Sequence, residues 1–338
     1  MKRPDIVIAW ETTRACTLSC RHCRASSSAD RSNNELTVPE ISKVFSDASK
    51  LGKCIIIFSG GEPLIRKDLE EAISAAVKAG HFPAVSTADG SLLTEERLDS
   101  LIKSGVSKFS FSIHSHDENL HDNFSCREGA TREAVDAFRR IRQRGIDFQV
   151  NTTVLPHNWD KLNLMLEKVI EWGADSWHVF FTVPTGRACG NDSLKISSQQ
   201  TEKVLKWLAE IAIKDVKIPI KVTCAPQYSR VLMQSDAGNK VRGRSCMAGN
   251  GFIFISSTGE VKPCGYFDIV AGNVRELPFD EIYTSSEILK SLRKVELLEG
   301  NCGVCGYKTV CGGCRAKAFA GGGNIFASDP DCQYLSGK

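Results

Sequence analysis

The chain has 338 residues, enough to bury one full core and a smaller second module. Its 43 lysines and arginines are mixed with 40 aspartates and glutamates along the chain, which argues against an extended nucleic-acid surface. No apolar run reaches the roughly 18 residues of a membrane span, and the N-terminus lacks the apolar region of a secretion signal. Fourteen cysteines without an export signal therefore indicate metal ligation in a reducing cytoplasm rather than disulfides.

Residues 5–215 alternate short β-branched runs with amphipathic stretches, several of which carry capping residues or terminal glycines. Strands are expected at 5–10, 54–58, 83–87, 108–114, 147–154 and 176–183. Helices are expected at 38–51, 67–79, 94–104, 131–144, 159–172 and 198–214. The nearly continuous apolar strands are typical of parallel strands buried on both faces. The sequence therefore predicts an α/β fold with its active site where the strands end.

Three cysteines, Cys16, Cys20 and Cys23, follow the first predicted strand on one short loop. Thiolates are soft ligands suited to iron or zinc, and no fourth cysteine follows nearby. Three ligands would leave one iron of a four-iron cluster without a protein ligand, and catalytic metal sites commonly keep such an open position. The alternatives are a zinc knuckle and cysteines packed as small hydrophobic side chains.

The run Gly60, Gly61, Glu62 and Pro63 ends the second predicted strand. Its glycines allow close backbone approach, although alone the run would predict only a turn. Together with the cysteine triplet it resembles the signature of radical SAM enzymes. The resemblance implies a partial (β/α)6 TIM-type barrel. It also implies a [4Fe–4S] cluster that binds S-adenosylmethionine (SAM) and cleaves it to a 5′-deoxyadenosyl radical, with Glu62 beside the SAM ammonium.

The same resemblance implies further SAM contacts at or just beyond strand ends. His22 would lie near adenine, Ser112 and Asn151 near the ribose or methionine, and Arg127 near the SAM carboxylate. Two structural alternatives stay open, since Ser112 can be satisfied by neighbouring backbone and Arg127 can be an ordinary solvated arginine. The histidines within residues 114–121, beside acidic residues, predict a polar loop rather than a metal site.

Past residue 215 glycine and cysteine become more frequent and helical periodicity fades. A hairpin is expected at 252–261. Seven cysteines between 246 and 332 resemble the SPASM extension of radical SAM maturases, which normally houses two auxiliary [4Fe–4S] clusters, although paired CxxC motifs also suit a zinc ribbon. The predicted organisation is a radical SAM core at 1–215, a linker at 216–243 and a small cysteine-rich SPASM-like domain at 244–338.

The SPASM resemblance implies two ligand sets. Cys246, Cys264 and Cys314 would bind the first auxiliary cluster, and Cys224 is the only upstream candidate for a fourth ligand. If Cys224 does not reach, one iron of that cluster stays open. The ligands implied for the second cluster are Cys302, Cys305, Cys311 and Cys332. One auxiliary cluster and two remain alternatives.

The likeness extends to one subgroup over 10–25, 148–154, 177–188, 223–230 and 251–274. These segments are similar to the heme synthases of the siroheme-dependent heme pathway, the iron-coproporphyrin III decarboxylases. The chain departs from the subgroup at 112–130 and at Gln227, where histidine is expected. The resemblance implies oxidative decarboxylation of two propionates to vinyl groups, giving heme b, with an auxiliary cluster as electron acceptor. Arg187, Arg230 and Arg315 would bind propionates, or each is structural.

Three other functions remain open. One is a related tetrapyrrole enzyme of the heme d1 or didecarboxysiroheme type, and another is a SPASM peptide maturase. The third is a non-enzymatic iron–sulfur or zinc-binding protein. For the enzyme, the expected partners are an iron-porphyrin substrate and an electron donor such as ferredoxin or flavodoxin, without nucleic acid.

Overall fold

The computed structural model describes residues 6–214, 216–241 and 243–334. Within them, ten strands form one sheet in the order β10-β9-β8-β1-β2-β3-β4-β5-β6-β7. The strands are β1 (Ile6–Thr13), β2 (Cys54–Gly60), β3 (Phe82–Thr87), β4 (Lys108–Ser112), β5 (Asp147–Val154), β6 (Ser176–Phe181), β7 (Ile220–Thr223), β8 (Phe252–Ile255), β9 (Glu260–Lys262) and β10 (Gly272–Asn273).

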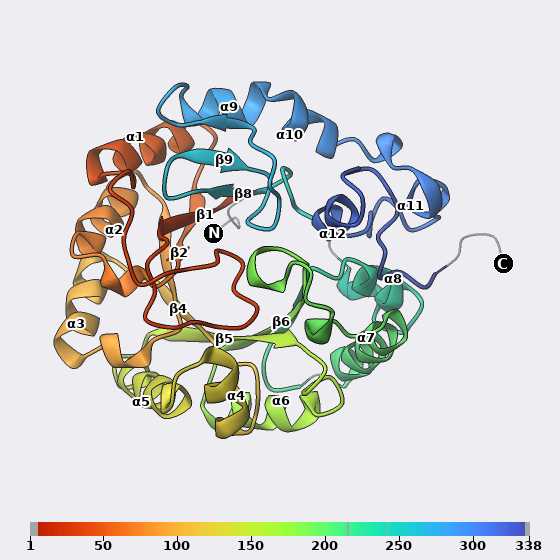
Figure 1. Cartoon of the computed structure of the whole chain (residues 1–338), viewed down its shortest axis with the longest axis horizontal. Helices are drawn as coiled ribbons and strands as arrows, with labels where there is room; N and C mark the ends of the chain where they lie inside the picture. The colour runs from red at the N-terminus through yellow and green to blue at the C-terminus, as the bar shows by residue number, and fades with distance from the viewer. Residues whose placement is uncertain (1–5, 215, 242, 335–338) are drawn as a thin grey trace.

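Helices surround the strands as an outer ring (Figure 1). They are α1 (Val38–Ser49), α2 (Leu69–Lys78), α3 (Glu95–Ser104), α4 (Glu118–Ser125), α5 (Ala130–Gln143), α6 (Leu162–Glu171), α7 (Ser198–Ile213), α8 (Gln227–Met233), α9 (Phe279–Ser285), α10 (Glu287–Leu292), α11 (Gly300–Val304) and α12 (Arg315–Ala320). Strands β1 to β7 pair in parallel, each with the next along the chain. The α/β architecture expected for a radical SAM core is therefore confirmed.

Local signals explain why most element bounds agree with those expected from the sequence. The Thr37 hydroxyl accepts from the Glu40 N–H and the Glu40 carboxylate accepts from the Thr37 N–H, so a capping box begins α1. Helix α3 ends at Ser104, and the residue that caps it, Gly105, has a φ of +106°, which suits glycine. The first residue of the strand expected at 5–10 lies outside the described residues. Strand β4 ends at Ser112, before the expected end, because the His114 N–H donates to the His121 ring instead of a neighbouring strand.

Burial on both faces was expected for the parallel strands, but it holds for β1 and not for β2, β3 and β4. Residues of β2, β3 and β4 alternate between buried and partly exposed. The buried set faces the helices: Phe45 of α1 packs against Phe58 of β2, with ring centroids 6.0 Å apart. By strand alternation the partly exposed set, which includes Ser110 and Ser112, lines the inside of the partial barrel. The interior is therefore available for a site.

The polar loop expected at 114–121 was also wrong, because a helix begins there. Asp117 caps α4 by accepting from the Leu120 N–H at 3.1 Å. Two of the expected loop's histidines, His114 and His121, are only 3% exposed. These side chains pack inside the protein instead of facing water, and the helix carries one of them inward.

The sheet continues into the C-terminal third of the chain. Strand β7 and helix α8 fall within the predicted linker, and β7 pairs with β6. Strand β8 runs parallel to β1, while the hairpin expected at 252–261 forms from β8 and β9. The domain boundaries inferred from the sequence remain predictions, and the shared sheet crosses them.

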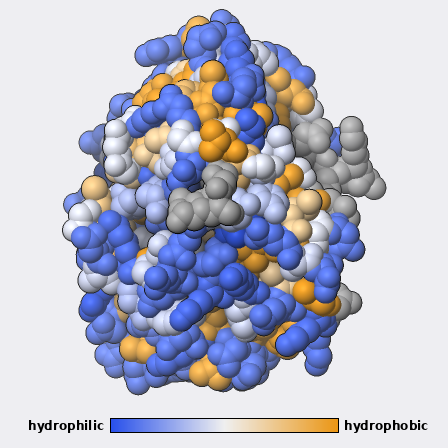
Figure 2. All heavy atoms as spheres, turned by 90° about the vertical axis from the view of Figure 1, so that its right-hand side faces the viewer, coloured by the Kyte–Doolittle hydropathy of each residue, from blue (hydrophilic) through white to orange (hydrophobic). Residues whose placement is uncertain are grey.

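The face that carries the C-terminal elements is mostly hydrophilic, with apolar residues gathered in its upper half (Figure 2). Val304 of α11, 73% exposed, is among the exposed apolar residues of the chain. Among the described helices none is both long and apolar enough to cross a membrane.

Candidate active site

The three N-terminal cysteines lie on the loop that follows β1. A distant segment, the short 3-10 helix η3 (Gly186–Ala188), stabilises this loop. Arg187 Nη1 donates to the Cys20 carbonyl at 2.9 Å, and the Arg187 backbone N–H donates to the Cys23 carbonyl at 3.0 Å. A Cβ atom at Gly186 would lie 2.3 Å from the Cys23 carbonyl oxygen, so this approach requires glycine. The segment that follows β6 thus holds the cysteine loop in place.

The cysteine loop has the chemistry of a cluster site. Burial raises the pKa of Cys16 to about 11 and that of Cys20 to about 12, with a further contribution at Cys20 from its neighbour Cys23. Metal binding must therefore displace protons. Within 6–214, 216–241 and 243–334, no three His, Cys, Asp or Glu side chains converge closely enough for a single metal ion. In a four-iron cluster each of the three cysteines would bind a different iron.

The glycines after β2 bring that loop against the backbone that precedes Cys16. A Cβ atom would lie 2.3 Å from the Thr13 carbonyl oxygen at Gly60 and 2.1 Å from the Ala15 carbonyl oxygen at Gly61. The Gly61 N–H donates to the Thr13 carbonyl and the Glu62 N–H to the Ala15 carbonyl, each at 2.8 Å. Both loops predicted from the sequence to bind SAM are therefore joined backbone to backbone.

The Glu62 side chain is fully buried. It accepts from Thr87 Oγ1 at 2.8 Å, the Ala88 N–H at 3.0 Å and the Asp89 N–H at 3.1 Å. Burial raises its pKa to about 7, and these hydrogen bonds oppose that rise. Pro63, the next residue, begins the 3-10 helix η1 (Pro63–Ile65). Glu62 thus ties the loop after β2 to the end of β3, and its contact with the SAM ammonium stays a prediction.

Arg127 belongs to a charged network at the end of β3. It forms an ion pair with Asp89 and another with Glu133 at 2.7 Å. Asp89 also accepts from Thr17 Oγ1, inside the cysteine loop, at 2.5 Å. The network therefore connects Arg127 to the cluster loop. Sequence reasoning missed Asp89 and Thr17, for which the available signals were their positions after a strand and between two cysteines. The SAM carboxylate contact of Arg127 stays a prediction.

His22 lies in a buried aromatic cluster beside the third cysteine. Its ring centroid is 4.6 Å from that of His114 and 4.8 Å from that of Phe124. Burial lowers the pKa of His22 to about 4, so the ring is neutral near pH 7. The neighbouring rings are fixed by backbone donors, since His114 Nδ1 accepts from the Thr153 N–H at 3.1 Å. The adenine contact of His22 stays a prediction.

Ser112 and Asn151 face each other in the register of β4 and β5. Both are partly exposed. Asn151 Oδ1 accepts from Gln149 Nε2 at 2.7 Å. The two predicted SAM contacts therefore lie together at the same end of the barrel, and their role there is untested.

Four cysteines distant in sequence come together in one cluster, where one of them precedes the first residue of α12. They are Cys224, Cys246, Cys264 and Cys314, and they pack against the apolar side chains of Val183, Ala248 and Phe267. The Cys224 thiol hydrogen-bonds to Cys314, which raises the pKa of Cys224 and lowers that of Cys314. Burial raises the pKa values of Cys246 and Cys264. Cys224 has a φ of +63°, an uncommon conformation for a non-glycine residue. The fourth candidate ligand thus lies beside the other three.

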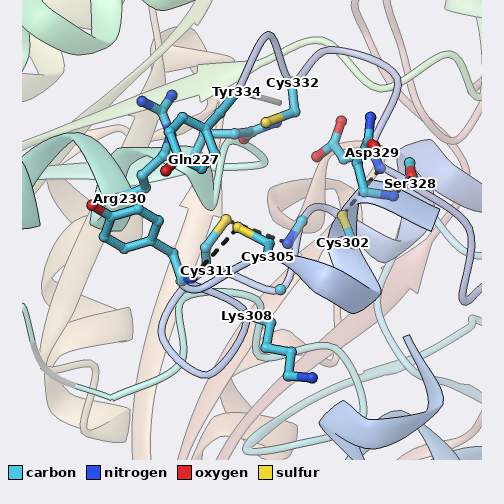
Figure 3. Close-up of a pocket in the computed structure, with 14 residues that line it drawn as sticks. Gln227, Arg230, Cys302, Cys305, Lys308, Cys311, Ser328, Asp329, Cys332 and Tyr334 are labelled. Carbon is cyan, nitrogen blue, oxygen red and sulfur yellow. Dashed lines mark hydrogen bonds between the residues drawn. The ribbon is translucent and has the colours of Figure 1, made fainter. Parts of the chain in front are cut away.

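A second set of cysteines surrounds a pocket beside α8 and α11 (Figure 3). Cys302, Cys305, Cys311 and Cys332 line it, and the space between its walls amounts to about 450 Å³ with its open side included. Backbone N–H groups of Asp329, Tyr307 and Gly313 lie 3.4 Å from the sulfurs of Cys302, Cys305 and Cys311, respectively. Hydrogen bonds to sulfur tune iron–sulfur clusters, so this donor set fits one.

Two of the arginines predicted to bind propionates lie beside these cysteines. Arg315 is 1% exposed, and its Nη1 donates to the Ile325 and Ala327 carbonyls at 2.9 and 2.7 Å. Arg230 is 4% exposed and forms an ion pair with Glu202 at 2.5 Å. These contacts are within the chain, as are those of Arg187. Propionate binding by the three arginines stays a prediction.

Comparisons with known proteins agree with this geometry. The sequence profile of the radical SAM superfamily matches residues 10–169, and that of the SPASM iron-sulfur cluster-binding domain matches 246–315. An AdoMet-dependent heme synthase of Methanosarcina barkeri is 40% identical and covers 98% of this chain and 97% of its own. One of Nitratidesulfovibrio vulgaris is 38% identical over 97% of this chain and 92% of its own.

A solved structure, Streptococcus suis SuiB bound to S-adenosylmethionine, has a similar fold. Its TM-score is 0.76 at 16% identity, over 97% of this chain and 77% of that chain. The match supports the radical SAM fold over nearly all of the present chain.

Proposed function

Because the chain belongs to the AdoMet-dependent heme synthase family of radical SAM enzymes, we propose that it converts iron-coproporphyrin III into heme b. The observation that carries the proposal is the 40% identity to a heme synthase over 98% of the chain. This likeness spans both the barrel and the cysteine-rich segment. The reaction is the oxidative decarboxylation of two propionate side chains to vinyl groups.

Each part of the barrel end has a role in this proposal. Cys16, Cys20 and Cys23 would hold a [4Fe–4S] cluster, which with bound SAM supplies a 5′-deoxyadenosyl radical. The backbone bonds between the loops after β1 and β2 keep the cluster and the SAM-binding loop in one fixed arrangement. Glu62 stabilises that arrangement through Thr87. The partly exposed inner face of the barrel would receive the porphyrin edge.

The substrate chemistry sets what the C-terminal cysteines must do. Removal of a hydrogen atom from the propionate β-carbon leaves a carbon radical. That side chain becomes a vinyl group when it loses carbon dioxide and one electron. The electron requires an acceptor, and the two auxiliary cysteine sets would supply it. We propose that Cys224 completes the first set, so that electrons leave without direct bonding between substrate and cluster iron.

The reductive cleavage of SAM consumes one electron for each vinyl group formed. A small one-electron donor, such as ferredoxin or flavodoxin, would deliver it. The cysteine-rich ligand sets also favour a reducing compartment, and we propose the cytoplasm.

Incubation of the anaerobically reconstituted protein with iron-coproporphyrin III, SAM and a reductant tests the function. We expect mass spectrometry to find a porphyrin that has lost carbon dioxide and two hydrogen atoms from each of two propionates, together with 5′-deoxyadenosine. Replacement of Cys16, Cys20 and Cys23 by alanine should abolish both products. The matched control is Cys189→Ala, at an exposed cysteine outside every predicted ligand set. Formation of 5′-deoxyadenosine with an unchanged porphyrin would refute this substrate, and its formation by the triple variant would refute the cluster assignment.

A further inference from the structure

Three buried side-chain atoms of α8 have no hydrogen-bond partner among the described residues, and they lie at the second cysteine set. Gln227 is 1% exposed, and neither atom of its side-chain amide has a partner in the part of the chain that the structure describes. Arg230 is 4% exposed, and its Nε is likewise without a partner there. Three positions apart on a helix, the two side chains lie on one face. Both line the pocket formed by the four cysteines (Figure 3).

The rest of the Arg230 guanidinium is fixed. Its Nη1 donates to Glu202 Oε1 at 3.1 Å and to Gln234 Oε1 at 2.8 Å, and its Nη2 donates to Glu202 Oε2. The group also lies 5.1 Å from the centroid of the Tyr334 ring. Arg230 therefore forms a rigid wall of the pocket beside Gln227. Gln227 is the residue whose whole side-chain amide has no hydrogen-bond partner in the described part of that wall.

A buried donor without an acceptor is unfavourable, because water is lost and nothing replaces it. The native occupant of the pocket should therefore supply the missing acceptor. The sulfur atoms of a cysteine-ligated cluster are such acceptors, and their negative charge orients the Gln227 amide with Nε2 toward them rather than Oε1. The same charge suits Arg230 Nε.

We propose that Gln227 donates a hydrogen bond from Nε2 to a sulfur of the second auxiliary cluster and raises its reduction potential. This inference rests on the proposed function, which places that cluster at Cys302, Cys305, Cys311 and Cys332. The reduced cluster carries one more negative charge than the oxidised cluster, so a hydrogen-bond donor stabilises it more. A higher potential makes the cluster a better acceptor for the electron that decarboxylation releases. Gln227 is thus a positioning and tuning residue, not a ligand.

The test is a redox titration of the reconstituted full-length protein, monitored by electron paramagnetic resonance. The signal of the second cluster is the one lost in the Cys302→Ala, Cys305→Ala double variant. In Gln227→Leu, we expect the equilibrium constant for one-electron reduction of that cluster to fall about tenfold. This corresponds to a fall of about 59 mV in its reduction potential. Gln227→His, which restores an N–H donor, should recover most of the shift. The matched control, Tyr228→Phe, should change nothing, because that hydroxyl donates to the Leu208 carbonyl outside the pocket.

A full iron content in Gln227→Leu with an unchanged potential would overturn the inference, as would an equal shift in Tyr228→Phe. If the leucine variant fails to assemble the cluster, Gln227→Met keeps an unbranched side chain of similar length and removes the N–H donor. Its potential must then fall, and an unchanged value would again overturn the inference. Failure of the proposed cluster is distinguishable, because the double cysteine variant would then lose neither iron nor a signal.

Discussion

The close contact between Gly61 and Ala15 predicts that one added methyl group at Gly61 strongly lowers the rate of SAM cleavage. A Cβ atom at Gly61 would lie 2.1 Å from the Ala15 carbonyl oxygen, 2.7 Å from its carbon and 2.9 Å from the Arg14 carbonyl oxygen. All three atoms are backbone, so no side-chain rotation relieves the clash. Separating the Cβ from the nearest oxygen to 3.0 Å requires a displacement of about 0.9 Å, and Cys16 is the next residue along that backbone.

Gly61→Ala should therefore lower the rate of SAM cleavage more than it lowers the stability of the folded protein. Overpacking of this kind costs about 1–3 kcal/mol of stability, whereas a misplacement of about 1 Å can cost a hundredfold in rate. We expect the rate of 5′-deoxyadenosine formation to fall about a hundredfold in a protein that still unfolds cooperatively. The assay is chromatography of 5′-deoxyadenosine under anaerobic turnover, together with thermal unfolding.

The control is Gly322→Ala, where an added Cβ meets no atom within 4 Å. It should leave both the rate and the stability nearly unchanged. A Gly61→Ala enzyme that forms 5′-deoxyadenosine at the wild-type rate would show that the two loops need not touch for SAM cleavage.

Two other predictions concern electron disposal and pH. Cys302→Ala with Cys305→Ala should still form 5′-deoxyadenosine but little vinyl product, because the substrate radical would lack an acceptor; a normal vinyl yield from the folded variant would show that this cluster is not needed. Burial raises the pKa of Glu62 from 4.5 to about 7. The folded state therefore binds a proton more tightly than the unfolded state, and the resulting contribution to the free energy of unfolding is lost as pH rises from about 4.5 through 7. Glu62→Gln should reduce that fall, measured by thermal unfolding across pH 5–8, and equal slopes in the two proteins would contradict the assignment.

Local signals in the sequence were sufficient to predict the barrel. The cap at Thr37, the terminating Gly105 and the apolar strands each act over a few residues, so a single sequence reveals them. Strand β7 was missed because Ile220 to Thr223 are all at least partly exposed, which weakens the apolar pattern of a strand. Helix α4 was missed because its histidine suggested solvent, although its cap, Asp117, was present.

Part of the candidate site could likewise be predicted from local motifs, and part of it depends on tertiary packing. The cysteine triplet and the glycine loop are compact motifs, whereas the position of Cys224 beside Cys314 depends on the whole fold. The burial of Arg230 and its pairing with Glu202, from another helix, also depend on tertiary packing, because nothing in the flanking residues specifies that partner. Sequence similarity gave these residues a role, and the fold specifies their contacts.

The pairing of β1 with β8 has a consequence for how the protein is made on the ribosome. Strand β1 emerges first, yet one of its two neighbours is absent until residue 255 of 338 has been synthesised. Until then, the strand that leads to the radical-generating cysteines has an open edge, and such edges can pair with other chains. We therefore expect nascent chains that stall before β8 to depend on chaperones, and versions truncated at residue 243 to aggregate rather than yield a smaller working enzyme.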